Sequence, residues 1–167
     1  MRLFVPIFTA LQKNEVSFVV VGGVAVVLHG YARLTADLDL VIGLDEKNVT
    51  NAVKAMKALG YVPRVPVNPM DFANEKIRKQ WIEEKGLRVF SFVKPMNPLV
   101  GVDFFAEYPI DFDLLLKRSE IQKLGPASVR ICGIDDLIRM KKMAGRAKDL
   151  EDIRFLEVLK NEKKEDR

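Results

Sequence analysis

The spacing of apolar residues changes along the chain, and these changes divide it into helices and strands. Near the N-terminus apolar residues recur every three or four positions with Pro6 in the first turn, which predicts an amphipathic helix packed on the core. Its apolar positions are Leu3, Phe4, Ile7, Phe8 and Leu11. Residues 16 to 22 (VSFVVVG) are short, apolar and rich in β-branched side chains, so we expect a buried strand there. Residues 23 to 31 follow as a helix that Gly30 closes.

The middle of the chain continues the alternation of helix and strand. Residues 37 to 43 (DLDLVIG) predict a second strand, and residues 45 to 60 predict an amphipathic helix with Asp45 as its N-cap. The apolar stripe of that helix is Val49, Val53, Met56 and Leu59. Residues 71 to 86 are expected to be helical. The segments LRVFSFVK and LVGVDFFA then predict two strands joined by a PMNP turn.

The last third of the chain predicts a helical piece around residues 110 to 117, a strand or two near 120 to 132, and two helices separated near Gly145. The apolar side of the first helix, expected to pack beside the sheet, consists of Leu137, Met140 and Met143 or Ala144. The second helix is expected to hold the first in place through Leu150, Ile153, Leu156 and Leu159. This order of elements predicts an α/β or α+β fold, with a mixed central sheet flanked by helices. We expect a single domain over residues 1 to 167, with a core of about 15 to 132 and C-terminal helices over about 134 to 162.

The composition narrows the chemistry that the chain can perform. Hydrophobic residues make up 49% and charged residues 30%, which is typical of a globular protein. The single cysteine, Cys132, excludes an internal disulfide framework, and the single histidine, His29, argues against histidine-based metal sites. We expect His29 to be packed and bonded to backbone. A net charge of +4 is compatible with a phosphate-bearing ligand or RNA, and without an apolar stretch of membrane-spanning length a cytoplasmic location is the default expectation.

Two aspartates interrupt the apolar strand at residues 37 to 43. Asp37 and Asp39 are two positions apart, so on a strand they project from the same face. Carboxylates held this close repel each other unless a cation or a donor lies between them, and such a pair suits Mg²⁺, which prefers carboxylates together with substrate phosphates. The alternative is a pair at the strand edge that faces solvent beside Arg33 or a lysine.

Two further features favour phosphate chemistry. Gly22 and Gly23 follow a strand and open a helix, where backbone N–H groups can meet a phosphate, although two glycines can also form a simple tight turn. Neither a Walker A loop nor a dinucleotide fingerprint is present. Asp103 lies in an apolar strand and needs a charged partner or a metal if it is buried. If that strand lies beside residues 37 to 43, a third carboxylate joins the first two, and three carboxylates around one or two Mg²⁺ ions suit phosphoryl or nucleotidyl transfer.

The pattern GG-x-A-x-x-x-HG-x-x-R-x-T-x-DLDLVI at residues 22 to 42 resembles the nucleotidyltransferase superfamily, which has the DNA polymerase β-like palm fold. It is most similar to the branch of AbiEii toxin nucleotidyltransferases and related minimal nucleotidyltransferases. DLIRMKKMAGRAKDLEDIRFLEVL at residues 136 to 159 is similar to the C-terminal signature of that branch, a lysine-containing helix followed by Arg-x-Lys-Asp-Leu. With Asp103 between them, the resemblance spans most of residues 17 to 159.

The resemblance implies a role for each matching residue. It makes Asp37, Asp39 and Asp103 the metal-binding and catalytic carboxylates, and it makes Gly22 and Gly23 the phosphate-binding turn. Many members of the superfamily have Gly-Ser at that turn, with the hydroxyl on a phosphate. Because this chain has Gly-Gly, the contact has to come from backbone alone or from a nearby residue such as Thr35.

Several charged residues near the two motifs have two readings each. Arg33 could hold a triphosphate in a bidentate contact or pair with an aspartate of its own strand. Lys141 and Lys148 could reach phosphates or an acceptor, or they could be exposed helix lysines. Asp149 is expected to cap the last helix, and its match to the signature adds acceptor binding as a second role. Trp81 is expected to be a packing residue.

These features predict an enzyme that moves a nucleoside monophosphate from an NTP to an acceptor hydroxyl, with Mg²⁺ or Mn²⁺ as cofactor. The acceptor could be a protein side chain, a tRNA end or a small hydroxyl compound. The resemblance adds that the enzyme could belong to a toxin–antitoxin system with a cognate partner protein. The alternative is a non-catalytic nucleotide-binding or interaction module that acts with a partner protein.

Overall fold

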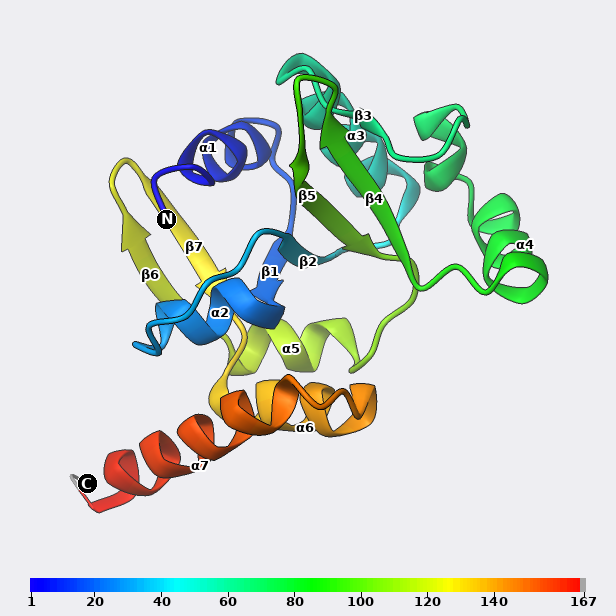
Figure 1. The fold of residues 1–167 in the computed structure, drawn as a ribbon. Helices are drawn as coiled ribbons and strands as arrows, with labels where there is room; N and C mark the ends of the chain where they lie inside the picture. Colours follow the sequence, from blue (N-terminus) through cyan, green and yellow to red (C-terminus); the bar gives the residue numbers. More distant parts are fainter. Residues whose placement is uncertain (166–167) are drawn as a thin grey trace.

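A seven-stranded mixed sheet forms the centre of the protein, as the computed structural model describes it for residues 1–165 (Figure 1). The strand order is β3-β4-β5-β2-β1-β7-β6. The strands are β1 (Phe18–Val21), β2 (Leu38–Ile42), β3 (Val62–Pro63), β4 (Val89–Lys94), β5 (Asn97–Phe105), β6 (Glu120–Leu124) and β7 (Ala127–Ile131). Strand β1 runs antiparallel to β2 and parallel to β7, whereas β2 runs parallel to β5. The predicted mixed sheet flanked by helices is therefore confirmed.

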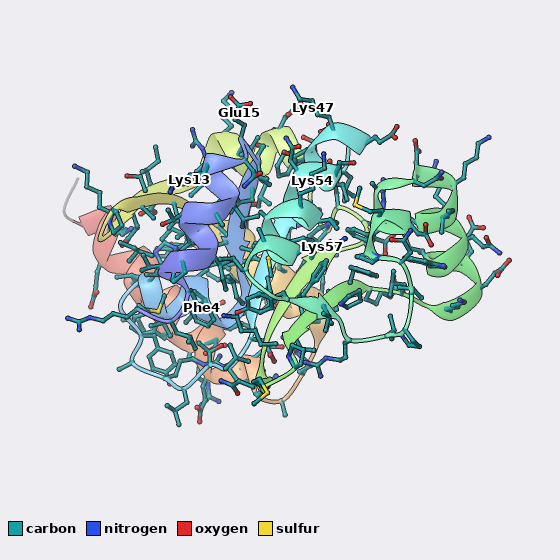
Figure 2. The ribbon with its side chains drawn as sticks, turned by 90° about the horizontal axis from the view of Figure 1, so that it is seen from above. Phe4, Lys13, Glu15, Lys47, Lys54 and Lys57 are labelled. Carbon is teal, nitrogen blue, oxygen red and sulfur yellow. The ribbon has the colours of Figure 1, made fainter. Side chains whose placement is uncertain are left out.

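The helices are α1 (Val5–Lys13), α2 (Gly22–Leu28), α3 (Glu46–Ala58), α4 (Glu75–Lys85), α5 (Phe112–Arg118), α6 (Ile134–Ala144) and α7 (Asp149–Glu165), with a 3-10 turn, η1, at Pro69–Ala73. Helices α1 and α3 lie side by side. Figure 2 looks onto these two helices and shows their exposed lysines, Lys13, Lys47, Lys54 and Lys57. Helices α6 and α7 pack together at the other end of the molecule, next to α2 (Figure 1). No helix within residues 1–165 combines the length and the apolar character that crossing a bilayer requires.

Local sequence signals set the ends of several helices. The Asp45 carboxylate accepts a hydrogen bond of 2.9 Å from the backbone N–H of Asn48, which confirms the predicted N-cap of α3. Gly145 ends α6 in the left-handed conformation, as the predicted break requires. The helix expected at residues 71 to 86 begins only at Glu75, because Asn74 caps it and a separate 3-10 turn precedes it.

Strand β4 shows how the sheet is covered on its two faces. Phe90 and Phe92 are buried, whereas the alternate residues Val89, Ser91 and Val93 are only half-buried. Phe90 stacks on Phe72 of η1 and on Trp81 of α4, so the helical layer covers that face. All four residues of β1, by contrast, are buried. The sheet is therefore covered on both faces at its centre and remains partly open on one face of β4 and β5.

Candidate active site

The register of the sheet places two of the three predicted aspartates side by side. In the parallel pairing of β2 with β5, Asp39 is the partner of Asp103. In the antiparallel pairing of β1 with β2, Asp39 is the partner of Val21, which directly precedes Gly22. Because paired positions point to the same face, the Asp39 carboxylate lies between Asp103 and the turn at Gly22.

The two glycines of the turn make room for side chains of the site. Gly22 has a φ of 62°, and a Cβ atom built there would lie 2.7 Å from Cγ of Asp39 and closer still to its Oδ2. A Cβ atom at Gly23 would lie 2.7 Å from the Thr35 hydroxyl oxygen and 3.5 Å from one terminal nitrogen of Arg33. The Thr35 hydroxyl therefore occupies the space that a serine side chain at position 23 would fill.

Asp37, Asp39 and Asp103 form a negatively charged cluster, and nearby cationic side chains compensate its charge only in part. Burial raises the pKa of Asp39 to about 6, with further contributions from the charges of Asp103 and Asp37, while Arg146 and Lys141 act in the opposite direction. Burial also raises the pKa of Asp103, although hydrogen bonding from Ser91 and the charge of Arg64 oppose the shift. A cation between the carboxylates would relieve this repulsion, so the chemistry of the residues fits a hard divalent ion.

Asp37 is exposed and is turned toward the neighbouring strand. Its Oδ1 accepts a hydrogen bond of 3.0 Å from the backbone N–H of Gly101 in β5. Within residues 1–165, no group of three or more histidine, cysteine, aspartate or glutamate side chains is arranged to hold a metal ion. The charges of the three aspartates thus act on one another, but the three carboxylates are not arranged around one cation position. That all three bind the same cation stays a prediction.

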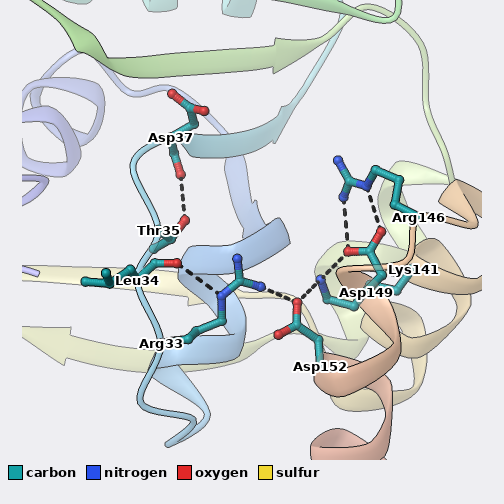
Figure 3. Close-up of polar contacts among 8 residues, drawn as sticks. All are labelled: Arg33, Leu34, Thr35, Asp37, Lys141, Arg146, Asp149 and Asp152. Atoms are coloured by element: carbon teal, nitrogen blue, oxygen red, sulfur yellow. Dashed lines mark hydrogen bonds and ion pairs between the residues drawn. The ribbon is translucent and has the colours of Figure 1, made fainter.

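A second charged cluster, which we call the helix network, consists of Arg33, Lys141, Arg146, Asp149 and Asp152 (Figure 3). The Lys141 ammonium donates to Asp149 at 3.1 Å and to Asp152 at 2.6 Å. Arg146 donates to both carboxylate oxygens of Asp149, and Arg33 pairs with Asp152. Burial raises the pKa of Asp149, but hydrogen bonds and charge from Arg146 and Lys141 outweigh this effect, so the net shift is downward.

The helix network corrects several expectations. Lys141 is 4% exposed, so the prediction of a solvent-facing helix lysine was wrong; it lies on the inward stripe of α6 with Leu137 and Ile138. Arg33 pairs with α7 rather than with an aspartate of its own strand. Asp149 is the first residue of α7 instead of its cap, because its carboxylate is bound by Lys141 and Arg146. Lys148 is exposed, and its predicted role stays untested.

The inward stripe of α7 also differs from the predicted one. Leu150 is 58% exposed, and Asp149, Asp152, Ile153 and Leu156 are the buried positions of its first two turns. Ile153 and Leu156 are buried and Leu159 packs against the core, as predicted, so the stripe of α7 was wrong only at Leu150. On α6, Met143 and Ala144 are exposed, so that part of the predicted apolar side was also wrong.

Two other predictions of packing roles are confirmed. Nε2 of His29 lies 2.8 Å from the backbone carbonyl oxygen of Cys132, so this histidine is held by backbone at the end of α2. Trp81 stacks on Phe90 with 5.8 Å between ring centroids. Arg64 and Ser91, which both act on Asp103, were missed from the sequence. Neither belongs to a motif: the pairing of β4 with β5 brings Ser91 to the site, and the edge strand β3 brings Arg64.

No protein-family model and no curated protein sequence matches the chain. Solved structures do resemble it. A candidate nucleotidyltransferase from Thermotoga maritima is 15% identical, with a TM-score of 0.57 over 92% of this chain and 89% of that one. The antibiotic-resistance factor ANT(2″)-Ia is 14% identical, with a TM-score of 0.59 over 98% and 90%. An antigenic nucleotidyltransferase-like protein from Paracoccidioides brasiliensis is 18% identical, with a TM-score of 0.57 over 91% and 71%.

These similarities concern the fold, since all three identities are low. The chain therefore has a nucleotidyltransferase-like fold, as its sequence motifs predicted. A crystal structure of ANT(2″)-Ia contains adenylyl-2″-tobramycin, which shows a nucleotide joined to a hydroxyl compound on a protein of this fold.

Proposed function

We propose that this protein is a metal-dependent nucleotidyltransferase that transfers a nucleoside monophosphate from an NTP to an acceptor hydroxyl. The observation that carries the proposal is the placement of Asp39, which has the Gly22 turn on one side and Asp103 on the other. Nucleotidyl transfer needs phosphate-binding backbone and carboxylates at one point. The similarity to solved nucleotidyltransferases supports the same reading.

Asp39 and Asp103 would hold the Mg²⁺ or Mn²⁺ ion, and Asp37 would join them when its carboxylate leaves the Gly101 amide. The bound ion would neutralise charge on the triphosphate and on the attacking and leaving oxygens. The raised pKa of Asp39 supports this assignment, because an uncompensated carboxylate gains from a cation.

The triphosphate would bind at the glycine turn. Backbone N–H groups at Gly22 and Gly23 would donate to it, and the Thr35 hydroxyl oxygen lies 2.7 Å from where a Cβ atom of Gly23 would be. Arg33 presents one terminal nitrogen to the Gly23 turn while Asp152 holds the other. Asp152 therefore acts as a positioning residue for Arg33, and the guanidinium keeps one nitrogen for a phosphate oxygen.

The transfer itself is a single displacement. The acceptor oxygen forms a bond to the α-phosphorus, the bond from that phosphorus to the bridging oxygen breaks, and pyrophosphate leaves. The acceptor proton passes to a carboxylate of the site. Asp103 is the candidate for that step because it lies on the side of Asp39 away from the glycine turn.

A more specific assignment is a member of the AbiEii-like branch that acts as the enzyme of a toxin–antitoxin pair. The two sequence stretches that carry this resemblance meet in space, since Arg33 of the first pairs with Asp152 of the second. Arg146 and Lys141 of the second stretch also act on Asp39 of the first.

Label transfer tests the proposal directly. The protein is incubated with each α-labelled NTP, Mg²⁺ or EDTA, and cell RNA or lysate. We expect label transfer that requires the metal and falls at least a hundred-fold in Asp39→Asn and Asp103→Asn. Asp113→Asn, a change of the same kind at an exposed residue of α5, should leave transfer intact. Metal-dependent NTP binding without transfer to any acceptor would instead indicate a non-catalytic module.

A further inference from the structure

A row of polar side chains crosses four neighbouring strands at the site. The backbone N–H of Arg64, directly after β3, donates to the carbonyl oxygen of Ser91 at 2.9 Å and so extends the pairing of β3 with β4. Ser91 is paired with Asp103, and Asp103 with Asp39. Paired positions share a face of the sheet, so Arg64, Ser91, Asp103 and Asp39 form one line.

The two ends of this row of side chains define two sides of the site. The glycine turn lies beyond Asp39 at one end, and Arg64 lies beyond Ser91 at the other. If the NTP binds at the glycine turn, the acceptor has to approach from the side of Ser91 and Arg64. There the face of β4 is only half-buried, which leaves Val89, Ser91 and Val93 accessible beside Asp103.

Arg64 reaches back over the sheet toward the aspartates. One of its terminal nitrogens lies 3.2 Å from where a Cβ atom of Gly101 would be, and Oδ1 of Asp37 lies 2.7 Å from the same point. The missing side chain at Gly101 thus makes room for both groups. Arg64 is exposed and, within residues 1–165, forms no ion pair, whereas Arg33, Lys141 and Arg146 each pair with a carboxylate.

We infer that Arg64 and Ser91 form the acceptor side of the active site, and that Arg64 selects an acceptor carrying a phosphate group close to its reactive hydroxyl. This inference rests on the proposed function. A guanidinium with free donors binds a phosphate by two parallel hydrogen bonds, and Ser91 keeps the Asp103 carboxylate in place beside the incoming hydroxyl. A polycationic acceptor such as tobramycin offers this guanidinium no anionic group to bind.

The test measures acceptor binding and does not depend on turnover. Amide NMR shifts of Gly101 and Asp103 are followed while glycerol 1-phosphate, glycerol, tobramycin or a short RNA with a free 3′ hydroxyl is added, with and without Mg²⁺ and a non-transferable NTP analogue. Wild type is compared with Arg64→Ala, Arg64→Lys and Arg88→Ala. The last is the matched control, an exposed arginine next to β4 that pairs with Glu107.

We expect the phosphate-bearing probes to bind at Gly101 and Asp103, and neutral glycerol and tobramycin to leave these amides unchanged. Affinity should fall about ten-fold or more in Arg64→Ala, recover in part in Arg64→Lys, and stay unchanged in Arg88→Ala. Tighter binding of the RNA than of glycerol phosphate would identify a polynucleotide end as the source of the phosphate, and the reverse order a free phosphorylated compound.

Equal phosphate binding in wild type and Arg64→Ala, or binding of tobramycin at these amides, would overturn the inference. So would a loss of NTP-analogue affinity in Arg64→Ala with acceptor binding intact, since Arg64 would then serve the donor. Failure of the proposed function would look different, because the Mg²⁺–NTP analogue would then fail to bind to the wild-type protein.

Discussion

The protein has two charged clusters that act on each other electrostatically, the helix network and the aspartate cluster. The negative charges are compensated by cationic side chains in the first and are largely uncompensated in the second. In the helix network the carboxylates of Asp149 and Asp152 each contact two cationic side chains. In the aspartate cluster Asp37, Asp39 and Asp103 repel one another, and burial adds to the cost. In the helix network each buried carboxylate has its counter-charges. In the aspartate cluster the ionised carboxylates lower the stability of the fold, and a bound cation would remove this destabilisation. Charge that is left uncompensated therefore distinguishes the aspartate cluster from the helix network.

The largest expected effect is on the helix network. Lys141→Ala leaves two buried carboxylates short of a cation, so it should lower the free energy of unfolding by about 3–5 kcal/mol. Lys142→Ala, which removes an exposed ion pair with Glu157 on the same helix, should cost about 1 kcal/mol or less. Denaturant unfolding of both variants measures the difference. Equal stabilities would mean that the network contributes nothing to the fold.

The opposite sign is expected for Asp39→Asn. Because the pKa of Asp39 is about 6 in the folded protein and 3.8 in a model compound, the folded state holds this proton more tightly than the unfolded chain. The stability that the proton contributes is present below pH 3.8 and is lost as the pH rises through 6. Above that pH the ionised carboxylate costs of the order of 3 kcal/mol.

Asp39→Asn should therefore raise the melting temperature at pH 8, and the gain should vanish near pH 4. Asp113→Asn, at an exposed position, controls for the loss of a charge. Mg²⁺ should raise the melting temperature of wild type at pH 8 but not that of Asp39→Asn. A gain that does not change with pH would contradict the electrostatic origin of the cost.

A smaller effect is expected at the glycine turn. Gly22 and Gly60 both have positive φ angles, but only at Gly22 would a Cβ atom meet another side chain, that of Asp39. Gly60→Ala should cost about 1 kcal/mol, the strain of a left-handed backbone. Gly22→Ala should cost about 2–3 kcal/mol and also displace Asp39 from Asp103, which abolishes metal-dependent NTP binding. Thermal unfolding and calorimetry check the two parts, and equal costs would show that Asp39 moves aside freely.

The sequence predicted the elements and the aspartates better than it predicted the charged helices. The strand that carries Asp39, with Asp37 directly before it, was recognisable because two carboxylates lie at the start of an otherwise apolar run, and Asp103 stood out in its own apolar strand. Lys141, Asp149 and Asp152 lie on buried helix faces, but a single helical pattern assigns charged residues to solvent. Only the packing of α6 on α7 makes their burial favourable, because each helix supplies the counter-charge of the other.

Arg64 and Ser91 were beyond prediction for a different reason. Arg64 reaches the site through the register of a two-residue edge strand, β3, which a proline-rich stretch does not reveal, and Ser91 is placed beside Asp103 by the pairing of β4 with β5. The sequence left the missing serine contact to backbone alone or to Thr35; the Thr35 hydroxyl lies beside Gly23, and its role stays a prediction.

The pairing of Arg33 with Asp152 also has a consequence for the order in which the protein is made. The two residues are separated by 119 positions, so the ribosome releases the loop that carries Arg33 well before the helix that holds it. Until α7 has been synthesised and has docked, the Arg33 guanidinium lacks the partner that aims it at the glycine turn. A nascent chain can thus have most of its central sheet in place before the Arg33 guanidinium is held against the glycine turn.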